Sequence, residues 1–134
     1  MKNSVKFNKM ERSDTLAIYL KDINRYPLLT AKEEKECIAL SQKGDARAKE
    51  KLINSNLRFV VKIAKKYRNK GIPFDDLISE GNIGLTIAAD RFDSEKNVRF
   101  ISYAVWWIKQ TILKAISEKS RLIHLPINRM NDLS

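Results

Sequence analysis

Two adjacent tryptophans, Trp106 and Trp107, lie in the stretch RFISYAVWWIKQTILK, which has neither proline nor glycine and reads as a helix. Neighbouring helical positions point about 100° apart, so two adjacent rings cannot both occupy one core stripe. Placed on a helical wheel, the aliphatic residues of 99–119 form one continuous arc. Trp107 falls at the border of this arc and Trp106 falls outside it, so the ring of Trp106 needs another role.

The face that carries Trp106 also carries cations and an amide. Its members include Arg99, Ser102, Tyr103, Lys109, Gln110, Leu113 and Lys114. Aromatic rings between cations are typical of single-stranded nucleic-acid binding, because the rings stack on unpaired bases and the cations hold phosphates. Gln110 adds an amide that can hydrogen-bond a base edge. Spacing alone leaves open a second interpretation, in which this face packs against another helix of the domain.

The charge balance also bears on the partner. Twenty-six Lys and Arg against sixteen Asp and Glu leave a net charge of +10. This favours a polyanionic partner, such as nucleic acid or an acidic membrane surface, although a lysine-rich soluble protein has the same balance. Acidic residues gather in 33–36 and 75–80, whereas 62–70 and the tryptophan segment are basic. We therefore expect separate faces for separate partners.

Several classes of function lack their sequence features. No apolar run approaches the length that a bilayer requires, and the N-terminus is charged where a signal peptide would be apolar, which predicts a soluble, intracellular protein. Cys37 and His124 are each the sole residue of their type, so no disulfide, metal or cofactor is expected. We find no paired carboxylates, nucleophile with a base, or phosphate loop, and therefore predict no catalysis.

Helical periodicity predicts an all-α fold, a compact bundle of about five to six helices. The expected helices span about 14–26, 30–44, 45–71, 75–91 and 99–119. Asp14 and Asp45 are expected N-caps, and Thr30 with Glu33 predicts a capping box. Gly81 and Gly84 each cost about 1 kcal/mol relative to alanine inside a helix. They indicate close approach of another element, within the domain or on a partner.

Three segments are expected along the chain. Residues 1–13 form a flexible N-terminal segment, 14–119 one helical domain, and 120–134 a connector. Within the connector, RLIHLP predicts a short extended segment. Pro126 would then be the first residue of a sixth helix that the end of the chain cuts off.

Four stretches together resemble a known family. NLRFVVKIAKKY, DLISEGNIGL, RFDSEKNVRFISYAVWWIKQTI and SRLIHLP closely resemble, in this order, the core of the bacterial housekeeping-type RNA polymerase sigma factors of the sigma-70 family. DTLAIYLKDINRYPLLTAKEE resembles the segment that precedes this core in primary sigma factors. The resemblance covers residues 14–134. It implies a non-enzymatic initiation factor of the bacterial cytoplasm and nucleoid that docks on core RNA polymerase and binds promoter DNA, with anti-sigma regulators as further partners and no membrane role.

The same resemblance implies how the −10 element is melted. Tyr103 matches the aromatic residue that stacks on the flipped adenine, the second base of the element. Around that adenine pocket the matching residues are Phe92, Asp93 and Lys96, with Asp93 standing where Glu is usual. The pair that braces the upstream edge of the opened bubble is matched by Trp106 and Trp107, and the same melting segment contains Phe100 and Ser102.

Other positions match contacts further along the DNA and on the polymerase. Gln110 matches the residue associated with the first, still paired, base of the element, and Leu113 stands where a polar residue helps to read it. Asn56 and Phe59 match the pocket for the last, flipped thymine. Contacts with a coiled coil of the largest catalytic subunit are implied for Asp76, Ser79, Glu80 and Asn82, with Ser79 in place of a common Gln.

The chain contains no recognisable acidic N-terminal extension and no C-terminal helix-turn-helix for the −35 element, so alone it is not expected to locate a full promoter. Two other hypotheses stay open. A truncated sigma could occupy polymerase as a docking or competitor module without directing initiation. A general basic helical bundle would bind RNA or DNA with steep salt dependence and little base preference.

Overall fold

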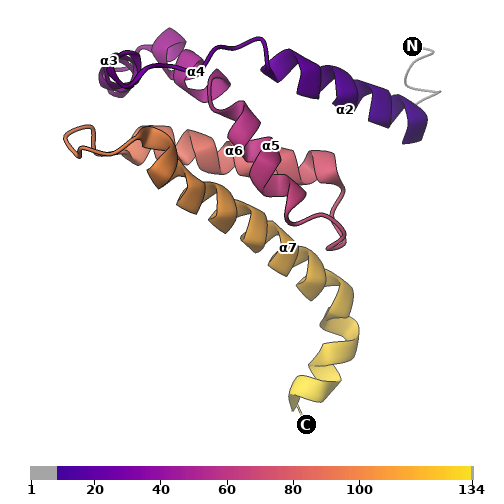
Figure 1. Ribbon diagram of the computed structural model, residues 1–134. Helices are drawn as coiled ribbons and strands as arrows, with labels where there is room; N and C mark the ends of the chain where they lie inside the picture. The colour runs from indigo at the N-terminus through magenta and orange to yellow at the C-terminus, as the bar shows by residue number, and fades with distance from the viewer. Residues whose placement is uncertain (1–8, 134) are drawn as a thin grey trace.

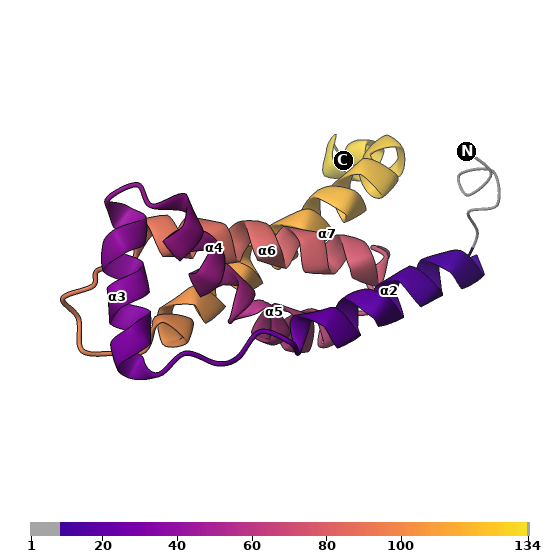
Figure 2. The same ribbon diagram turned by 90° about the horizontal axis from the view of Figure 1, so that it is seen from above.

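The computed structural model describes residues 9–133, and the side chains of 15–119. Over the described residues the chain is all-α, as predicted, and contains no strand. The helices are α2 (Lys9–Ile23), α3 (Ala31–Gln42), α4 (Ala46–Asn54), α5 (Leu57–Lys65), α6 (Phe74–Arg91) and α7 (Phe100–Leu133) (Figure 1). From above, α3 lies crosswise at the end of the α6 and α7 pair, and α2 runs along the opposite half of the molecule (Figure 2).

The pairing of α6 with α7 forms the largest helix contact. Two glycines of α6 allow close approach, Gly84 to α7 and Gly81 to both α5 and α7. A Cβ on Gly84 would lie 2.5 Å from the carbonyl oxygen of Trp107, and one on Gly81 would lie 2.6 Å from Cγ1 of Val60. Both distances are shorter than van der Waals contact, so a side chain would force the helices apart. The element that approaches these glycines is therefore inside the domain.

The core lies where α4, α5, α6 and α7 meet. Its largest fully buried side chains include Leu52, Leu77, Leu85, Phe100, Ile108 and Ile112. Ala104, Ile108 and Ile112 are completely buried, which confirms that the predicted aliphatic arc of α7 is its core face. The opposite face of the same helix is thereby left outside the core.

One long helix over 45–71 was predicted, and this prediction is wrong, because the segment divides into α4 and α5. The side chains of Ser55 and Asn56 both donate hydrogen bonds to the carbonyl of Leu52, at 2.9 and 2.8 Å. The backbone N–H of Asn56 bonds instead to Ile53. Short polar side chains that bond the local backbone compete with the helical ladder, and here they end the first helix. Asp45 caps α4 as expected.

Two boundaries near the chain ends also differ from expectation. Helix α2 begins at Lys9, so residues 9–13 are helical and Asp14 is not its N-cap, while 1–8 lie outside the described residues. Helix α7 continues to Leu133, so the extended connector and the new helix at Pro126 are wrong. A proline inside a helix removes one hydrogen bond and bends the axis without always ending it. Figure 1 shows such a bend in the C-terminal part of α7.

Candidate nucleic-acid interface

The two tryptophans of α7 have different environments. Trp106 is 56% exposed, whereas Trp107 is half-buried and packs against the core. Their ring centroids lie 5.0 Å apart with the planes perpendicular, which is a favourable edge-to-face arrangement. The structure confirms the predicted sorting of the pair, and it leaves Trp106 with an open aromatic surface.

Arg91, the last residue of α6, supports this pair. Its guanidinium lies 5.2 Å from the ring centroid of Trp107, within cation–π range. Its backbone carbonyl accepts a hydrogen bond from the Tyr103 hydroxyl at 3.5 Å. Arg91 was not among the residues selected from the sequence, because only the packing of α6 on α7 brings it beside the tryptophan. It adds a cation next to the exposed rings.

Tyr103 rests on an aromatic cluster. The Phe92 ring lies 5.5 Å from that of Tyr103 and 5.6 Å from that of Phe100. Phe92 and Phe100 are buried, so the expectation that their rings belong to a DNA-binding surface is corrected. They form the base on which the half-buried Tyr103 is held, and of these three rings Tyr103 is the one that reaches the surface.

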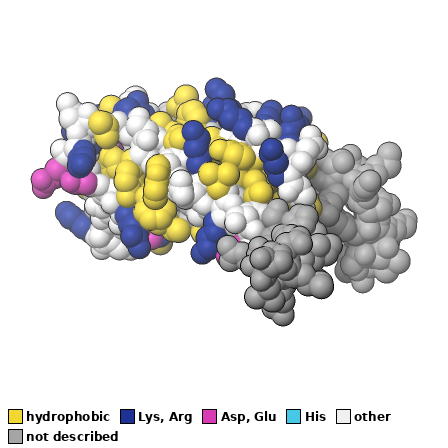
Figure 3. Space-filling view, turned by 90° about the horizontal axis from the view of Figure 1, so that it is seen from below, with side chains coloured by type: hydrophobic (Ala, Val, Ile, Leu, Met, Phe, Trp, Pro, Cys, Tyr) yellow, Lys and Arg dark blue, Asp and Glu magenta, His cyan; other side chains and the backbone are white. Residues whose placement is uncertain are grey.

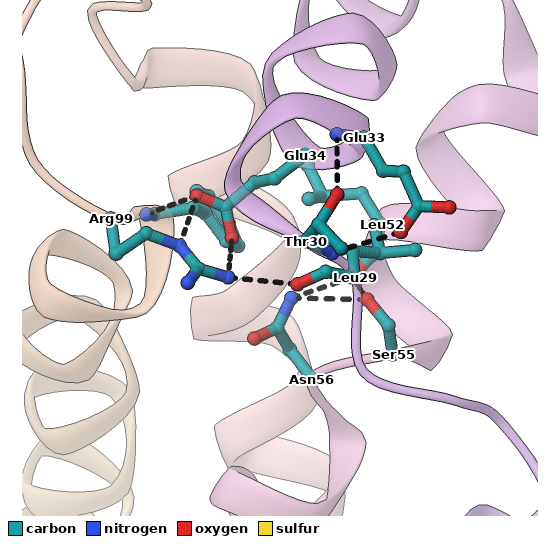
Figure 4. Close-up of polar contacts among 9 residues, drawn as sticks. Leu29, Thr30, Glu33, Glu34, Leu52, Ser55, Asn56 and Arg99 are labelled. Carbon is teal, nitrogen blue, oxygen red and sulfur yellow. Dashed lines mark hydrogen bonds and ion pairs between the residues drawn. The ribbon is translucent and has the colours of Figure 1, made fainter.

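Arg99 is also reassigned, because its guanidinium is paired with groups of the same chain. Its guanidinium donates to the Glu34 carboxylate at 3.1 and 3.2 Å and to the Leu29 carbonyl at 2.9 Å (Figure 4). The same carboxylate accepts the backbone N–H of Phe100 at 2.8 Å. Glu34 therefore ties α3 to the N-terminus of α7. Sequence reasoning missed Glu34, which there reads only as an acidic residue in the first turn of a helix.

Asn56 and Phe59 line one cavity together. The cavity has a volume of about 210 Å³ and is also lined by Leu28, Leu29, Ser55, Glu34, Arg99 and Ile101. Asn56 is buried and its amide nitrogen bonds to the Leu52 carbonyl and, at 3.4 Å, to the Ser55 hydroxyl. The break between α4 and α5 thus orients the amide beside the junction of α3 with α7.

The remaining predicted residues lie at the surface. Asp93 and Lys96 are exposed in the turn between α6 and α7, where the Asp93 carboxylate accepts the N–H of Glu95 at 3.0 Å. On α7, Ser102, Gln110 and Lys114 are exposed and Lys109 is half-buried. On the side where α7 lies, hydrophobic and basic side chains are interleaved, and most of the visible acidic groups lie at one end (Figure 3). This surface suits a polyanion that carries stacking groups.

The four residues assigned to polymerase do not form one patch. Asp76, Ser79 and Glu80 share one side of α6 and line a groove of about 330 Å³ that also includes Glu118 and Lys119 of α7. Asn82 points to α2, and its amide donates to the Tyr19 hydroxyl at 3.4 Å. Ser79 lines both this groove and the neighbouring cavity of about 250 Å³ beside α2.

Comparison with known proteins identifies the family. Residues 52–122, more than half of the chain, match the family model described as Sigma-70 region 2, and residues 14–45 match Sigma-70 factor, region 1.2. The chain belongs to the sigma-70 family. It is 49% identical over 122 residues to RNA polymerase sigma factor RpoS of Coxiella burnetii, a match that covers 91% of this chain and 35% of that protein. This sigma chain therefore spans about a third of the length of the curated relative that it matches.

The two matched regions of the sigma chain meet at the buried carboxylate of Glu34. Region 1.2 contains α3 and thus Glu34, while region 2 contains Asn56, Phe59, Arg99 and the described side chains of α7. The ion pair of Glu34 with Arg99 consequently joins one region to the other. Within the part of the sigma chain that the structure describes, no helix has both the length and the apolarity needed to cross a membrane.

Proposed function

We propose that this sigma chain binds core RNA polymerase, recognises the promoter −10 element and helps to melt it by capturing flipped bases of the non-template strand. The observation that carries the proposal is the exposed ring of Trp106 on a helix whose core-facing Ala104, Ile108 and Ile112 are completely buried. Next to it stand Trp107, Arg91 and the half-buried Tyr103. These groups supply stacking surfaces and positive charge at one place.

The energetics of melting explain why rings are needed there. Extruding a base from the stack costs a few kcal/mol, and stacking on an aromatic side chain returns about 1–3 kcal/mol per base. In the proposal Trp106 and Trp107 occupy the upstream edge of the opened duplex, and Tyr103 stacks on the adenine of the second position. Phe92 packs against Tyr103, which reduces the entropy that this ring loses on binding.

Neighbouring groups extend the proposed contact in both directions. Gln110 would address the first base pair of the element, and Lys109 and Lys114 would neutralise phosphates. The cavity beside Asn56 and Phe59 would receive the last, flipped thymine. Lys96 and Asp93 lie exposed in the turn near the adenine site, where Lys96 can reach the backbone of the strand.

The acidic side of α6 provides the proposed polymerase contact. Asp76 and Glu80 line the groove between α6 and α7, and their charge disfavours DNA and favours a basic protein surface. The partner would be the coiled coil of the largest catalytic subunit, with anti-sigma regulators as alternative occupants. The protein would act in the bacterial cytoplasm at the nucleoid, without a membrane partner, cofactor or catalysis of its own.

Binding of a labelled single-stranded non-template oligonucleotide tests the proposal. Fluorescence anisotropy is measured with the chain and core polymerase, for the normal −10 sequence and for one whose second-position adenine is replaced. We expect replacement of the adenine to weaken binding strongly. Tyr103→Ala should abolish this difference between the two oligonucleotides, whereas Tyr103→Phe should preserve it, because phenylalanine keeps the ring. Equal binding of both oligonucleotides would refute base capture and leave a docking module or a nonspecific basic surface.

A further inference from the structure

Helix α3 contacts both ends of the turn 93–99 that joins α6 to α7. At the start of this turn, the side-chain amide of Gln42 donates a hydrogen bond to the Phe92 carbonyl at 2.6 Å. At its end, the Glu34 carboxylate accepts the backbone N–H of Phe100 at 2.8 Å. Figure 2 shows α3 crossing the end of the α6 and α7 pair, beside this turn. One helix therefore holds the two points between which the turn runs.

The geometry of α3 fixes the distance between these two points. Glu34 lies in its first turn and Gln42 is its last residue, a separation that corresponds to about 12 Å along the helix axis. Around the axis the two side chains point about 80° apart, so both extend toward the same side. A capping box at Thr30 secures the start of the helix. Because a capped helix changes its length little, α3 keeps the ends of the turn at one spacing.

Phe92 is the residue at which the chain leaves α6. Its N–H still bonds to the Ala88 carbonyl at 2.9 Å, whereas its own ψ of 133° is extended. The last carbonyls of a helix have no partner within it, and for Phe92 the amide of Gln42 supplies the donor. The buried Phe92 ring lies 5.5 Å from the ring of Tyr103. The Gln42 contact thus fixes the backbone from which the supporting ring projects.

The last turn of α6 is attached separately. Lys49 of α4 forms an ion pair with Asp90 at 2.8 Å, and the Arg91 carbonyl accepts the hydroxyl of Tyr103 on α7. Residues 90–92 are therefore held in succession by α4, α7 and α3. If the Gln42 contact is lost, α6 keeps its other attachments and only the start of the turn is released. The position of the turn then depends on Gln42 more than the folding of the domain does.

We propose that Gln42 is a positioning residue for adenine capture, and that α3, through Gln42 and Glu34, sets the span of the turn beside the adenine site. This inference rests on the proposed function, in which Tyr103 stacks on the flipped adenine. Gln42 touches no DNA in this role and acts through Phe92. It keeps the ring that supports Tyr103, and the turn that carries Lys96, in the arrangement that binds the base. Such preorganisation lowers the ordering cost of binding.

Gln42→Met tests the contact, because methionine has a similar length and no N–H donor. Anisotropy is measured with the chain and core polymerase, for the normal −10 oligonucleotide and for the one whose second-position adenine is replaced. We expect the ratio of the two affinities to fall by about twofold to tenfold, the range for one hydrogen bond, with the affinity for the replaced oligonucleotide unchanged. Glu36→Met, at another exposed position of α3, should keep the full ratio.

A double-mutant cycle tests whether Gln42 acts through Tyr103. In the Tyr103→Ala background, Gln42→Met should cause no further loss of affinity for the normal oligonucleotide, because the ring that it positions is absent. Additive losses would refute the positioning role. Equal weakening of both oligonucleotides by Gln42→Met would also refute it, since that pattern indicates general structural damage.

The outcomes separate this inference from the proposed function. If the parent chain discriminates the adenine and Gln42→Met keeps the full ratio, the positioning role is refuted and base capture stands. If the parent chain binds both oligonucleotides equally, both the inference and the proposed function fail.

Discussion

The junction of α3 with α7 and the outer face of α7 begin within a few residues of each other and have opposite character. At the junction, Glu34 is buried and accepts three hydrogen bonds, from Arg99 and from the N–H of Phe100. On the outer face, Trp106 and Leu113 are exposed apolar side chains that no described residue covers. The junction therefore fixes the start and the direction of α7. The outer face is the surface that α7 leaves available to a partner.

The comparison shows that a basic residue near a binding surface need not serve the ligand. Arg99 is 51% exposed in its side chain and lies one residue before α7, yet its donors go to Glu34 and to the carbonyl of Leu29. No hydrogen bond or ion pair is found for the side chain of Lys114 on the described surface, and it extends into solvent. Both side chains carry a positive charge and lie on or next to α7, so their partners decide the role.

The largest effect is expected when the junction is broken. Glu34→Ala leaves the first N–H of α7 without its acceptor and the Arg99 guanidinium without its carboxylate. We expect a loss of about 2–3 kcal/mol in the free energy of unfolding, measured by chemical denaturation. Glu36→Ala, which removes an exposed acid from the same helix, serves as the control and should change stability by less than about 0.5 kcal/mol. Equal stability of the two variants would show that the junction does not anchor α7.

The two adjacent tryptophans allow the same comparison, between an exposed and a half-buried side chain, within one turn of α7. Trp106→Ala should leave the unfolding free energy nearly unchanged and weaken binding of −10 DNA by about tenfold, the value of one stacking contact. Trp107→Ala should lower stability, because its half-buried ring packs on the core and on Arg91. Denaturation and anisotropy on both variants provide the test. A large stability loss in Trp106→Ala would mean that its ring is structural.

A smaller effect, on the salt dependence of DNA binding, should distinguish Lys114 from Arg99. Lys114→Ala should reduce the slope of log affinity against log salt by about one, because one phosphate contact is lost. Arg99→Ala should leave that slope unchanged when the measurement is made below the melting temperature of the variant, since its charge already faces Glu34. Titrations at several salt concentrations measure both slopes. A reduced slope in Arg99→Ala alone would reverse the two assignments.

The smallest expected effect concerns the start of α3. Hydrogen bonds from the Thr30 backbone N–H and hydroxyl lower the pKa of Glu33 below its usual value. The stabilisation from this carboxylate is thus present above the pKa of the unfolded chain and is lost as pH falls through the lower, folded pKa. Glu33→Gln keeps a capping side chain and should make stability slightly less sensitive to acid. Denaturation at pH 7 and pH 3 would detect the difference, and identical pH profiles would contradict it.

Much of the architecture follows from local sequence signals. The aliphatic spacing on α7 predicted which side enters the core, and Thr30 with Glu33 predicted the capping box that the structure contains. The glycines at 81 and 84 indicated a close approach but not its partners, which are the backbone of α7 at Gly84 and side chains of α5 and α7 at Gly81. These signals were readable because periodicity and capping involve residues within one or two turns of each other.

By itself, then, the sequence determined an all-α chain of the sigma-70 family with one apolar and one aromatic, basic face on α7. Only the tertiary structure decided that Phe92 and Phe100 are core, that Arg91 braces Trp107, and that Arg99 is held by Glu34. Glu34 and Arg99 are 65 residues apart, and no local pattern encodes which distant charge a side chain will meet. Local spacing selects the face of a helix, but the partner of each residue on it is set by how the helices pack.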